Sequence, residues 1–459
     1  MLVCAVPSAL LAAGAALLPA AAAAETVPGA LLGDRLPLWS VGPFAVMLLA
    51  IAVMPLVAER FWEHNRNKAV LSLVLGVPVA AWIATYDPHT VGHTLVEYLE
   101  FMLLLGSLFV IAGGVVVRGT LAGTPGLNTG LLAMGAVLAS LVGTTGASML
   151  LIRPLLRANS VRRRVAHVVV FFIFVVSNGG GLLTPLGDPP LFLGFLRKVP
   201  FLWTLRLLPE WLLVNGALLA IFYVVDSTLF RREDLATPGD LDELAVAHQV
   251  PLSIAGKRNF LYLAGVVGVL LVAGTYGLPF GVQEGGMLLM AGLSWFTTRR
   301  ELRGENRFTW GPIVEVAVVF VGIFCTMIPA LAILNARGGA LGIGEPWQFF
   351  WAAGLLSSFL DNAPTYLTFA AAASAIQGTD AGNLATLIVT ERGASLLAAI
   401  SLGSVLMGAN TYIGNGPNFM VKAIAEQSGV EMPGFFGYMA WSGAVLLPLF
   451  VVVTFLFLR

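Results

Sequence analysis

Polar side chains and glycines interrupt two apolar stretches of this sequence. The first interruption, SNGGGLLTPLGDPP, covers residues 177–190, and the second, GANTYIGNGPN, covers residues 408–418. A membrane-spanning helix broken in this way frees backbone N–H and C=O groups, which is tolerated only where they line a polar cavity. We therefore expect the two breaks to form a binding site for a polar or charged ligand.

Two more polar clusters lie in apolar surroundings, one after Gly143 and one after Leu360. With the breaks they predict a set of hydroxyl, amide and carboxylate ligands: Thr144, Thr145, Ser177, Asn178, Thr184, Asp188, Asp361, Asn362, Thr365, Asn410, Thr411, Asn415 and Asn418. Hard oxygen ligands of this kind suit Na⁺ or a proton, and the positive ends of interrupted helices suit an anion.

Asp361 and Asp188 are the two carboxylates of this set. An ionised carboxylate away from water is costly unless a cation or a donor lies beside it, so protons and Na⁺ compete for it. We therefore predict both as Na⁺ ligands. Two structural alternatives stay open: Asp188 as the N-cap of a helix that begins at Pro189, and Asp361 as a hydrogen-bonding residue that closes a turn.

The composition predicts a membrane protein. Hydrophobic residues make up 58% of the 459 residues and charged residues 11%, against roughly 25% charged in an average soluble protein. The 25 basic and 25 acidic side chains cancel, which gives no reason to expect a nucleic-acid partner. With two cysteines, and without a phosphate-binding loop or a hydrolase motif, the sequence predicts no cofactor and no enzyme.

Apolar windows predict an all-α polytopic fold with about ten membrane-spanning helices. Their ranges are 41–58, 69–85, 96–117, 165–176, 207–225, 260–276, 285–298, 313–334, 387–407 and 437–458. Residues 1–24 are apolar, rich in alanine and end in small side chains. They predict a signal peptide, with an uncleaved first helix as the alternative.

Two additional apolar segments, 127–159 and 346–376, contain polar turns at their centres. Basic loops at Arg118 and at Arg162 flank the first segment, and the positive-inside rule places both loops in the cytoplasm. A segment that enters and leaves on the same side is a re-entrant hairpin, and we predict one at each segment. A pair of short full spans is the alternative.

The second half of the chain repeats the first. Thr144 corresponds to Asn362 with an offset of 218, and Asn178 corresponds to Asn410 with an offset of 232. An odd number of predicted spans separates the halves, so we predict an inverted repeat. Its parts are 41–226 with hairpin 127–159 and broken helix 165–196, a cytoplasmic linker 227–258, and 259–459 with hairpin 346–376 and broken helix 387–427.

The stretch SNGGGLLTPLGDPP at 177–190, with LDNAPT at 360–365, resembles the ion transporter superfamily. This superfamily includes D-type sodium/proton antiporters, citrate–metal symporters and divalent-anion/sodium symporters. The resemblance implies two re-entrant hairpins and two unwound helices around a central site, a dimerising scaffold and elevator-like motion. Divalent-anion symporters carry Ser-Asn-Thr at both hairpin tips, and this chain does not. It is most similar to the antiporters and to the citrate–metal symporter-like group.

We therefore expect an ion-coupled secondary transporter in the bacterial inner membrane, first as a sodium/proton antiporter. Cation-coupled transport of citrate or another carboxylate is the alternative, and a membrane receptor without turnover is a third reading. The expected partners are the lipid bilayer, a small ion or carboxylate, and a second copy of the chain in a homodimer. The expected coupling ion is Na⁺ or H⁺.

Overall fold

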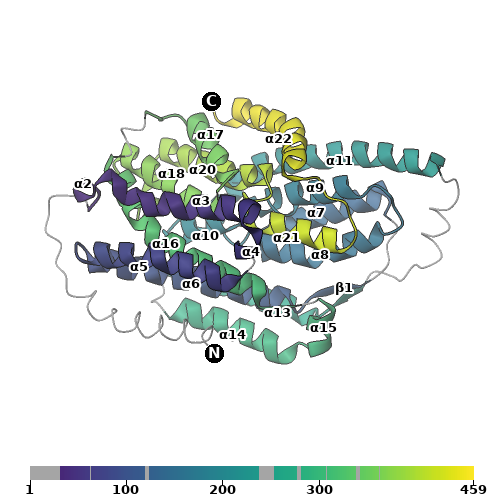
Figure 1. Ribbon diagram of the computed structural model, residues 1–459, viewed down its shortest axis with the longest axis horizontal. Helices are drawn as coiled ribbons and strands as arrows, with labels where there is room; N and C mark the ends of the chain where they lie inside the picture. The colour runs from purple at the N-terminus through teal and green to yellow at the C-terminus, as the bar shows by residue number, and fades with distance from the viewer. Residues whose placement is uncertain are drawn as a thin grey trace. The chain divides into compact units, whose positions relative to one another are not determined.

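The computed structural model describes residues 32–62, 64–118, 123–236, 253–276, 281–306, 308–337, 342–360 and 362–459 (Figure 1). These residues are mostly helical, and one antiparallel two-stranded sheet pairs β1 (Val116–Arg118) with β2 (Ser253–Ala255). The predicted signal peptide, residues 237–252 of the predicted linker and Asp361 lie outside the described residues.

Seven helices in the described part of the chain are long and apolar enough to cross a membrane, which agrees with an all-α multi-pass membrane protein. They are Asn65–Ala84, Pro88–Ala112, Pro125–Val142, Phe201–Glu233, Ile313–Leu334, Glu391–Asn410 and Phe435–Phe457. Shorter apolar helices cover Leu38–Ile51, Ala166–Leu182 and Arg258–Ala273. Pro125–Val142, which the sequence assigns to a hairpin arm, is thus long enough to span the membrane.

The chain forms two compact units. Unit 1 comprises the described parts of Met1–Leu104, Trp310–Gly342 and Ala370–Ala381. Its helices are α2 (Leu32–Arg35), η1 (Leu38–Val41), α3 (Gly42–Val57), α4 (Glu59–Trp62), α5 (Asn65–Ala84), most of α6 (Pro88–Ala112) and α16 (Gly311–Arg337).

In unit 1, α5 and α16 pack closely along each other. A Cβ atom on Gly322 would lie 2.7 Å from the Cβ atom of Ser72, so this glycine permits the close approach. Lys68, buried at the start of α5, pairs with Glu315 of α16 at 2.5 Å. The Lys68 side chain is 4% exposed and that of Glu315 is 47% exposed, so the pair lies at the edge of this interface.

Unit 2 contains the described parts of Leu105–Thr309, Ile343–Phe369 and Gly382–Arg459. Its first helices are α7 (Pro125–Val142), α8 (Thr144–Ala158), α9 (Ala166–Val175), η2 (Gly179–Leu182), α10 (Pro189–Leu196), η3 (Phe201–Leu207), α11 (Leu208–Ala236), α13 (Arg258–Tyr276), α14 (Val282–Thr297) and α15 (Arg300–Glu305). The later ones are α17 (Pro346–Ser357), the start of α18 (Asn362–Gln377), α19 (Leu384–Leu387), α20 (Glu391–Leu406), η5 (Met407–Asn410), α21 (Gly416–Gln427) and α22 (Phe435–Phe457).

Glycine and proline set the ends of the helices that matter for the site. Gly143 has a φ of 83°, a conformation that suits glycine, and it separates α7 from α8, which pack against each other. Prolines occupy the first turns of α10 and α21, where the missing N–H costs nothing. Consequently neither interrupted stretch is one continuous α-helix: a 3-10 turn and a loop separate α9 from α10, and α20 from α21.

Candidate functional site

Asp188 lies at the centre of the predicted ligand set, at the N-terminal end of α10. Thr144 Oγ1 donates to its Oδ1 at 2.8 Å, Asn415 Nδ2 donates to the same oxygen at 3.2 Å, and Asn362 Nδ2 donates to its Oδ2. The side chain makes no capping hydrogen bond to α10, although the residue occupies the N-cap position. Asp188 is 1% exposed. Its carboxylate is thus aimed at three neutral donors from three other helices.

Three asparagines continue this arrangement across the two breaks. Asn415 Nδ2 also lies 3.2 Å from Asn178 Oδ1 and 3.1 Å from the carbonyl oxygen of Ser177. Asn178 Nδ2 donates to Asn418 Oδ1 at 2.8 Å, and Asn418 Nδ2 donates to the carbonyl oxygen of Gly408 at 2.9 Å. All three asparagines are buried. Side-chain amides therefore join the first break directly to the second.

Two buried amide oxygens of the site have no hydrogen-bond partner among the described residues. Asn362 Oδ1 and Asn410 Oδ1 are both in this state, while the amide nitrogen of Asn362 donates to Asp188 and that of Asn410 donates to Ser358 Oγ at 2.9 Å. An unsatisfied buried acceptor costs about 1–3 kcal/mol. Such oxygens are suited to accept a hydrogen bond or to coordinate a cation that enters the site.

Matching hydrogen bonds hold the two breaks in place. Thr184 Oγ1 donates to the carbonyl oxygen of Ser140 near the end of α7, and Thr411 Oγ1 donates to that of Ser358 after α17 at 2.5 Å. Each hydroxyl also accepts from the backbone N–H two residues further on, at 3.2 Å in both breaks. Both threonine hydroxyls donate to backbone oxygens and thereby support the breaks, and their role as ligands stays a prediction.

These contacts indicate a correspondence between the breaks that differs from the one in the sequence comparison. Thr184 matches Thr411 with an offset of 227, whereas the sequence comparison pairs Asn178 with Asn410 with an offset of 232. The supporting residues Ser140 and Ser358 keep the offset of 218 that the sequence gives for the hairpins.

The new offset pairs Asp188 with Asn415. Asp188 has φ −146° and ψ 144°, and Asn415 has φ −150° and ψ 138°, each at the N-cap of the helix after its break. The preceding residues Gly187 and Gly414 also match, because a Cβ on either would collide with the carbonyl oxygen of Gly181 or Gly408 respectively. The two equivalent positions are thus in direct contact, and they carry different side chains.

The remaining predicted residues lie at different distances from this centre. Ser177 Oγ is 2.8 Å from Ser148 Oγ of α8, and Thr365 is buried in the first turn of α18. Thr145 is only half-buried. Asp361 precedes Asn362 and lies outside the described residues, so its predicted role as a Na⁺ ligand stays a prediction. Within the described ranges, no group of three or more His, Cys, Asp or Glu side chains is placed to hold a metal ion.

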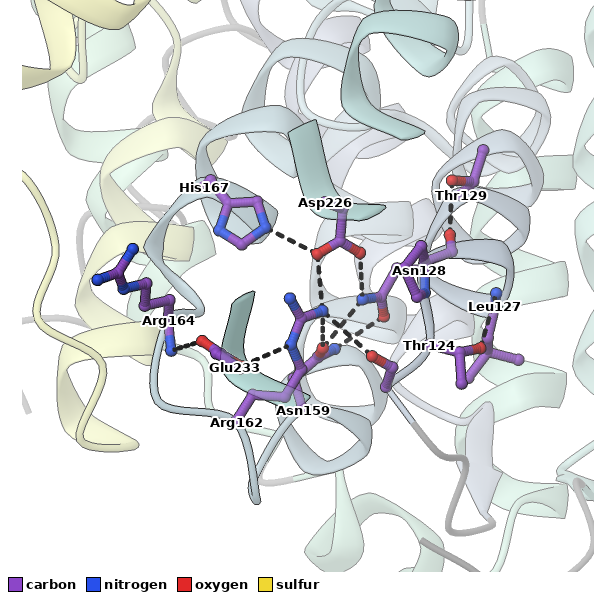
Figure 2. A network of polar contacts seen from close by, with 12 residues as sticks. Thr124, Leu127, Asn128, Thr129, Asn159, Arg162, Arg164, His167, Asp226 and Glu233 are labelled. Carbon is purple, nitrogen blue, oxygen red and sulfur yellow. Dashed lines mark hydrogen bonds and ion pairs between the residues drawn. The ribbon is translucent and has the colours of Figure 1, made fainter. Parts of the chain in front are cut away.

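A second buried polar network in unit 2 was not predicted from the sequence (Figure 2). Asp226 Oδ1 lies 2.7 Å from Arg162 Nη1 and 2.8 Å from His167 Nε2, and Asp226 Oδ2 accepts from Asn128 Nδ2 at 3.0 Å. Asn128 and Asn159 exchange two hydrogen bonds, at 2.9 and 2.8 Å. The network ties α7, α8, α9 and α11 together. Its one available signal was an aspartate in the apolar sequence of α11.

Long apolar helices, with two interrupted stretches that surround buried polar side chains, define a multi-pass membrane protein. A family model with the description "Putative citrate transport" matches residues 33–458, and the chain belongs to this family. The comparison with curated proteins gives no match. Membership identifies a transporter and agrees with the citrate–metal symporter-like resemblance, but it gives no support to sodium/proton exchange.

Proposed function

We propose that this protein is a secondary transporter that couples a cation, Na⁺ or H⁺, to the movement of citrate or a related carboxylate. The observation that carries the proposal is the environment of Asp188: a buried carboxylate held by neutral donors, one of which, Asn362, has an amide oxygen without a hydrogen-bond partner among the described residues. Carboxylate and amide oxygens are the ligands that hard cations prefer. The family membership supports the carboxylate part of the proposal.

The charges of Asp188, the cation and the carboxylate substrate couple the binding of the two ligands. An anion near Asp188 is repelled while that carboxylate is ionised and without a cation, and it is attracted once a cation is bound. The positive ends of the α10 and α21 dipoles then favour the anion. Because Pro189, Pro190 and Pro417 have no N–H, these ends act through their field more than through hydrogen bonds. Each ligand therefore strengthens the binding of the other.

The proposal also includes the architecture that the sequence predicts. The two halves form an inverted repeat of about ten spans, and α7–α8 and α17–α18 are its two re-entrant hairpins. The matching contacts of Thr184 and Thr411 support the repeat. The transporter lies in the bacterial inner membrane as a homodimer, with a signal peptide over residues 1–24 and Asp361 as a second Na⁺ ligand.

Uptake of radiolabelled citrate into proteoliposomes tests the proposal. We expect uptake that requires an inward gradient of Na⁺ or H⁺ and that unlabelled citrate competes away. The absence of citrate uptake and of citrate counterflow under every cation gradient would contradict it. Empty liposomes, treated in the same way, are the control for leakage.

Sodium/proton exchange is the second candidate. The observation in its favour is that Asp188 is a buried carboxylate next to Asn362, whose amide oxygen has no hydrogen-bond partner among the described residues, and a cation could use these oxygens without an anion. An internal pH dye in the same proteoliposomes decides between the two functions. Proton flux driven by Na⁺ or Li⁺ without citrate supports exchange, and flux that appears only with citrate supports the carboxylate transporter.

A further inference from the structure

A large cavity in unit 2 lies away from the candidate site. Its volume is about 940 Å³, and it is lined by the C-terminal end of α8, the loop to α9, the first residues of α9 and the C-terminal end of α21. The other ends of α9 and α21 carry Asn178 and Asn415 of the candidate site. Helices of this length are roughly 15–18 Å long. The cavity and the site thus lie at opposite ends of the same two helices, which also pack on each other.

Arginine dominates the charge of this cavity. Five arginines line it: Arg153, Arg157, Arg162, Arg163 and Arg164. Two lining residues, Glu305 and Glu431, oppose them. Arg157, Arg163 and Arg164 are exposed, and no ion pair among the described residues involves their guanidinium groups. In Figure 2 the guanidinium of Arg164 is directed away from the buried network, while its backbone N–H donates to Glu233 at 2.8 Å.

One of the five arginines, Arg162, is buried in the wall of the cavity. The side chain of Arg162 is 1% exposed, and Asp226 binds its Nη1 at 2.7 Å, whereas its Nη2 has no hydrogen-bond partner among the described residues. Beside it α9 begins at Ala166, and Val165 at its N-cap supplies no side-chain acceptor. A helix N-terminus with unfilled N–H groups attracts anions. Arg162, whose Nε also lies 3.5 Å from Glu233 Oε2, and the first residues of α9 therefore both line one arginine-rich cavity.

We propose that this cavity is a second binding site, separate from the helix breaks, for compact oxyanions that carry two or more negative charges. Arginine suits such ligands because its planar fork pairs with carboxylate and phosphate oxygens. The shared chemistry is that of a free polycarboxylate or phosphate and of an anionic lipid headgroup. The loop from Arg157 to Arg164 carries the positive charge typical of a cytoplasmic segment, so the site takes its ligand from that side.

Isothermal titration with inorganic pyrophosphate tests this site without depending on citrate transport. The full chain is placed in nanodiscs of phosphatidylcholine, which contain no anionic lipid. We expect one binding event that Arg163→Gln/Arg164→Gln weakens about tenfold, because two charge-assisted contacts are lost. Arg299→Gln/Arg300→Gln removes two other exposed arginines and leaves the affinity within about twofold, as expected for screened surface charges. The melting temperature of each variant shows that it is folded.

Three results would overturn the inference: no binding to the unaltered protein, equal binding by Arg163→Gln/Arg164→Gln, or loss of binding in Asp188→Asn, which would place the anion at the helix breaks. Nanodiscs that contain phosphatidylglycerol then separate the sources. If the lipid lowers the affinity for pyrophosphate, and if this competition is lost in Arg163→Gln/Arg164→Gln, the occupant is a lipid headgroup. If the affinity for pyrophosphate is unchanged, the occupant is a free anion. A transporter that fails to move citrate would still bind pyrophosphate here.

Discussion

The two helix breaks share a scaffold and differ in chemistry. In each, a threonine hydroxyl fastens the loop to the preceding pair of helices, and a glycine lets the chain fold back on itself. At the equivalent position, however, the first break carries the carboxylate of Asp188 and the second carries the amide of Asn415. The two breaks therefore share a backbone shape, and one charged side chain makes them chemically different.

We expect the largest effect on citrate uptake when positions 188 and 415 both carry an amide. We expect Asp188→Asn to reduce cation-coupled citrate uptake by about 100-fold or more, since breaking a buried charge arrangement costs about 3–5 kcal/mol. Glu426→Gln, which removes an exposed carboxylate from α21, should leave uptake within about twofold. Initial uptake rates in proteoliposomes measure both, and normal coupling in Asp188→Asn would show that Asp188 is not the cation ligand.

The opposite change makes both positions carboxylates. In Asn415→Asp a donor to Asp188, Asn178 and Ser177 becomes a second negative charge beside the first. We expect uptake at pH 7 to fall about tenfold or more, with partial recovery at lower pH as the shared site takes up a proton. A pH profile of uptake measures this. A profile parallel to that of the unaltered protein would contradict it.

The exchanged variant Asp188→Asn/Asn415→Asp keeps one carboxylate and one amide in contact. We expect it to be better folded than Asn415→Asp, with uptake above that of either single variant but below the unaltered protein, because the donors Thr144 and Asn362 stay with position 188. Double-mutant analysis of unfolding temperature and uptake measures the coupling. Additive losses would show that the two positions do not interact.

We expect the two unpartnered amide oxygens, those of Asn362 and Asn410, to contribute unequally to cation affinity. Leucine replaces asparagine with little change in shape. We expect Asn362→Leu to weaken the apparent Na⁺ affinity about tenfold, because it removes an amide oxygen from a residue in contact with Asp188, and Asn410→Leu to weaken it about threefold. The cation dependence of citrate uptake measures both. Unchanged cation affinity in the two variants would remove these oxygens from the site.

We expect the smallest effect from changes to the threonine hydroxyls that both breaks share. Thr184→Val and Thr411→Val each remove one hydroxyl that bonds to a backbone oxygen, and we expect each to cost about 1 kcal/mol in stability with little change in cation affinity. Thermal unfolding monitored by size-exclusion chromatography compares them. A much larger loss for one threonine would show that the two breaks are not supported in the same way.

Local sequence was sufficient to predict where helices stop. Glycine and proline act through their own backbone, so the turn at Gly143 and the helix starts at Pro189 and Pro417 could be read directly. The pairing of the two breaks could not, because it depends on hydrogen bonds between segments more than 200 residues apart, such as that from Asn178 to Asn418. The match of residue types differs by five positions from the pairing that the contacts of Thr184 and Thr411 indicate.

The buried network of Arg162 and Asp226 shows a second limit of sequence reasoning. The loop arginines together indicate the cytoplasmic side of the membrane, but one of them folds inward onto a carboxylate 64 positions later in the chain. Charge counting treats all arginines alike. Only the packing of α8, α9 and α11 distinguishes the buried arginine from its exposed neighbours Arg163 and Arg164.

The contact between Asp188 and Asn415 has a consequence for the ancestry of the chain. Two separate half-length subunits related by symmetry would place the same residue on both sides of this contact. Two aspartates there would repel, and two asparagines would carry no charge. A fused gene removes that restriction, because each copy can then mutate alone. If the two halves are the inverted repeat proposed above, the single carboxylate of this pair is therefore a property that a fused chain can have and a symmetric pair of half-length subunits cannot.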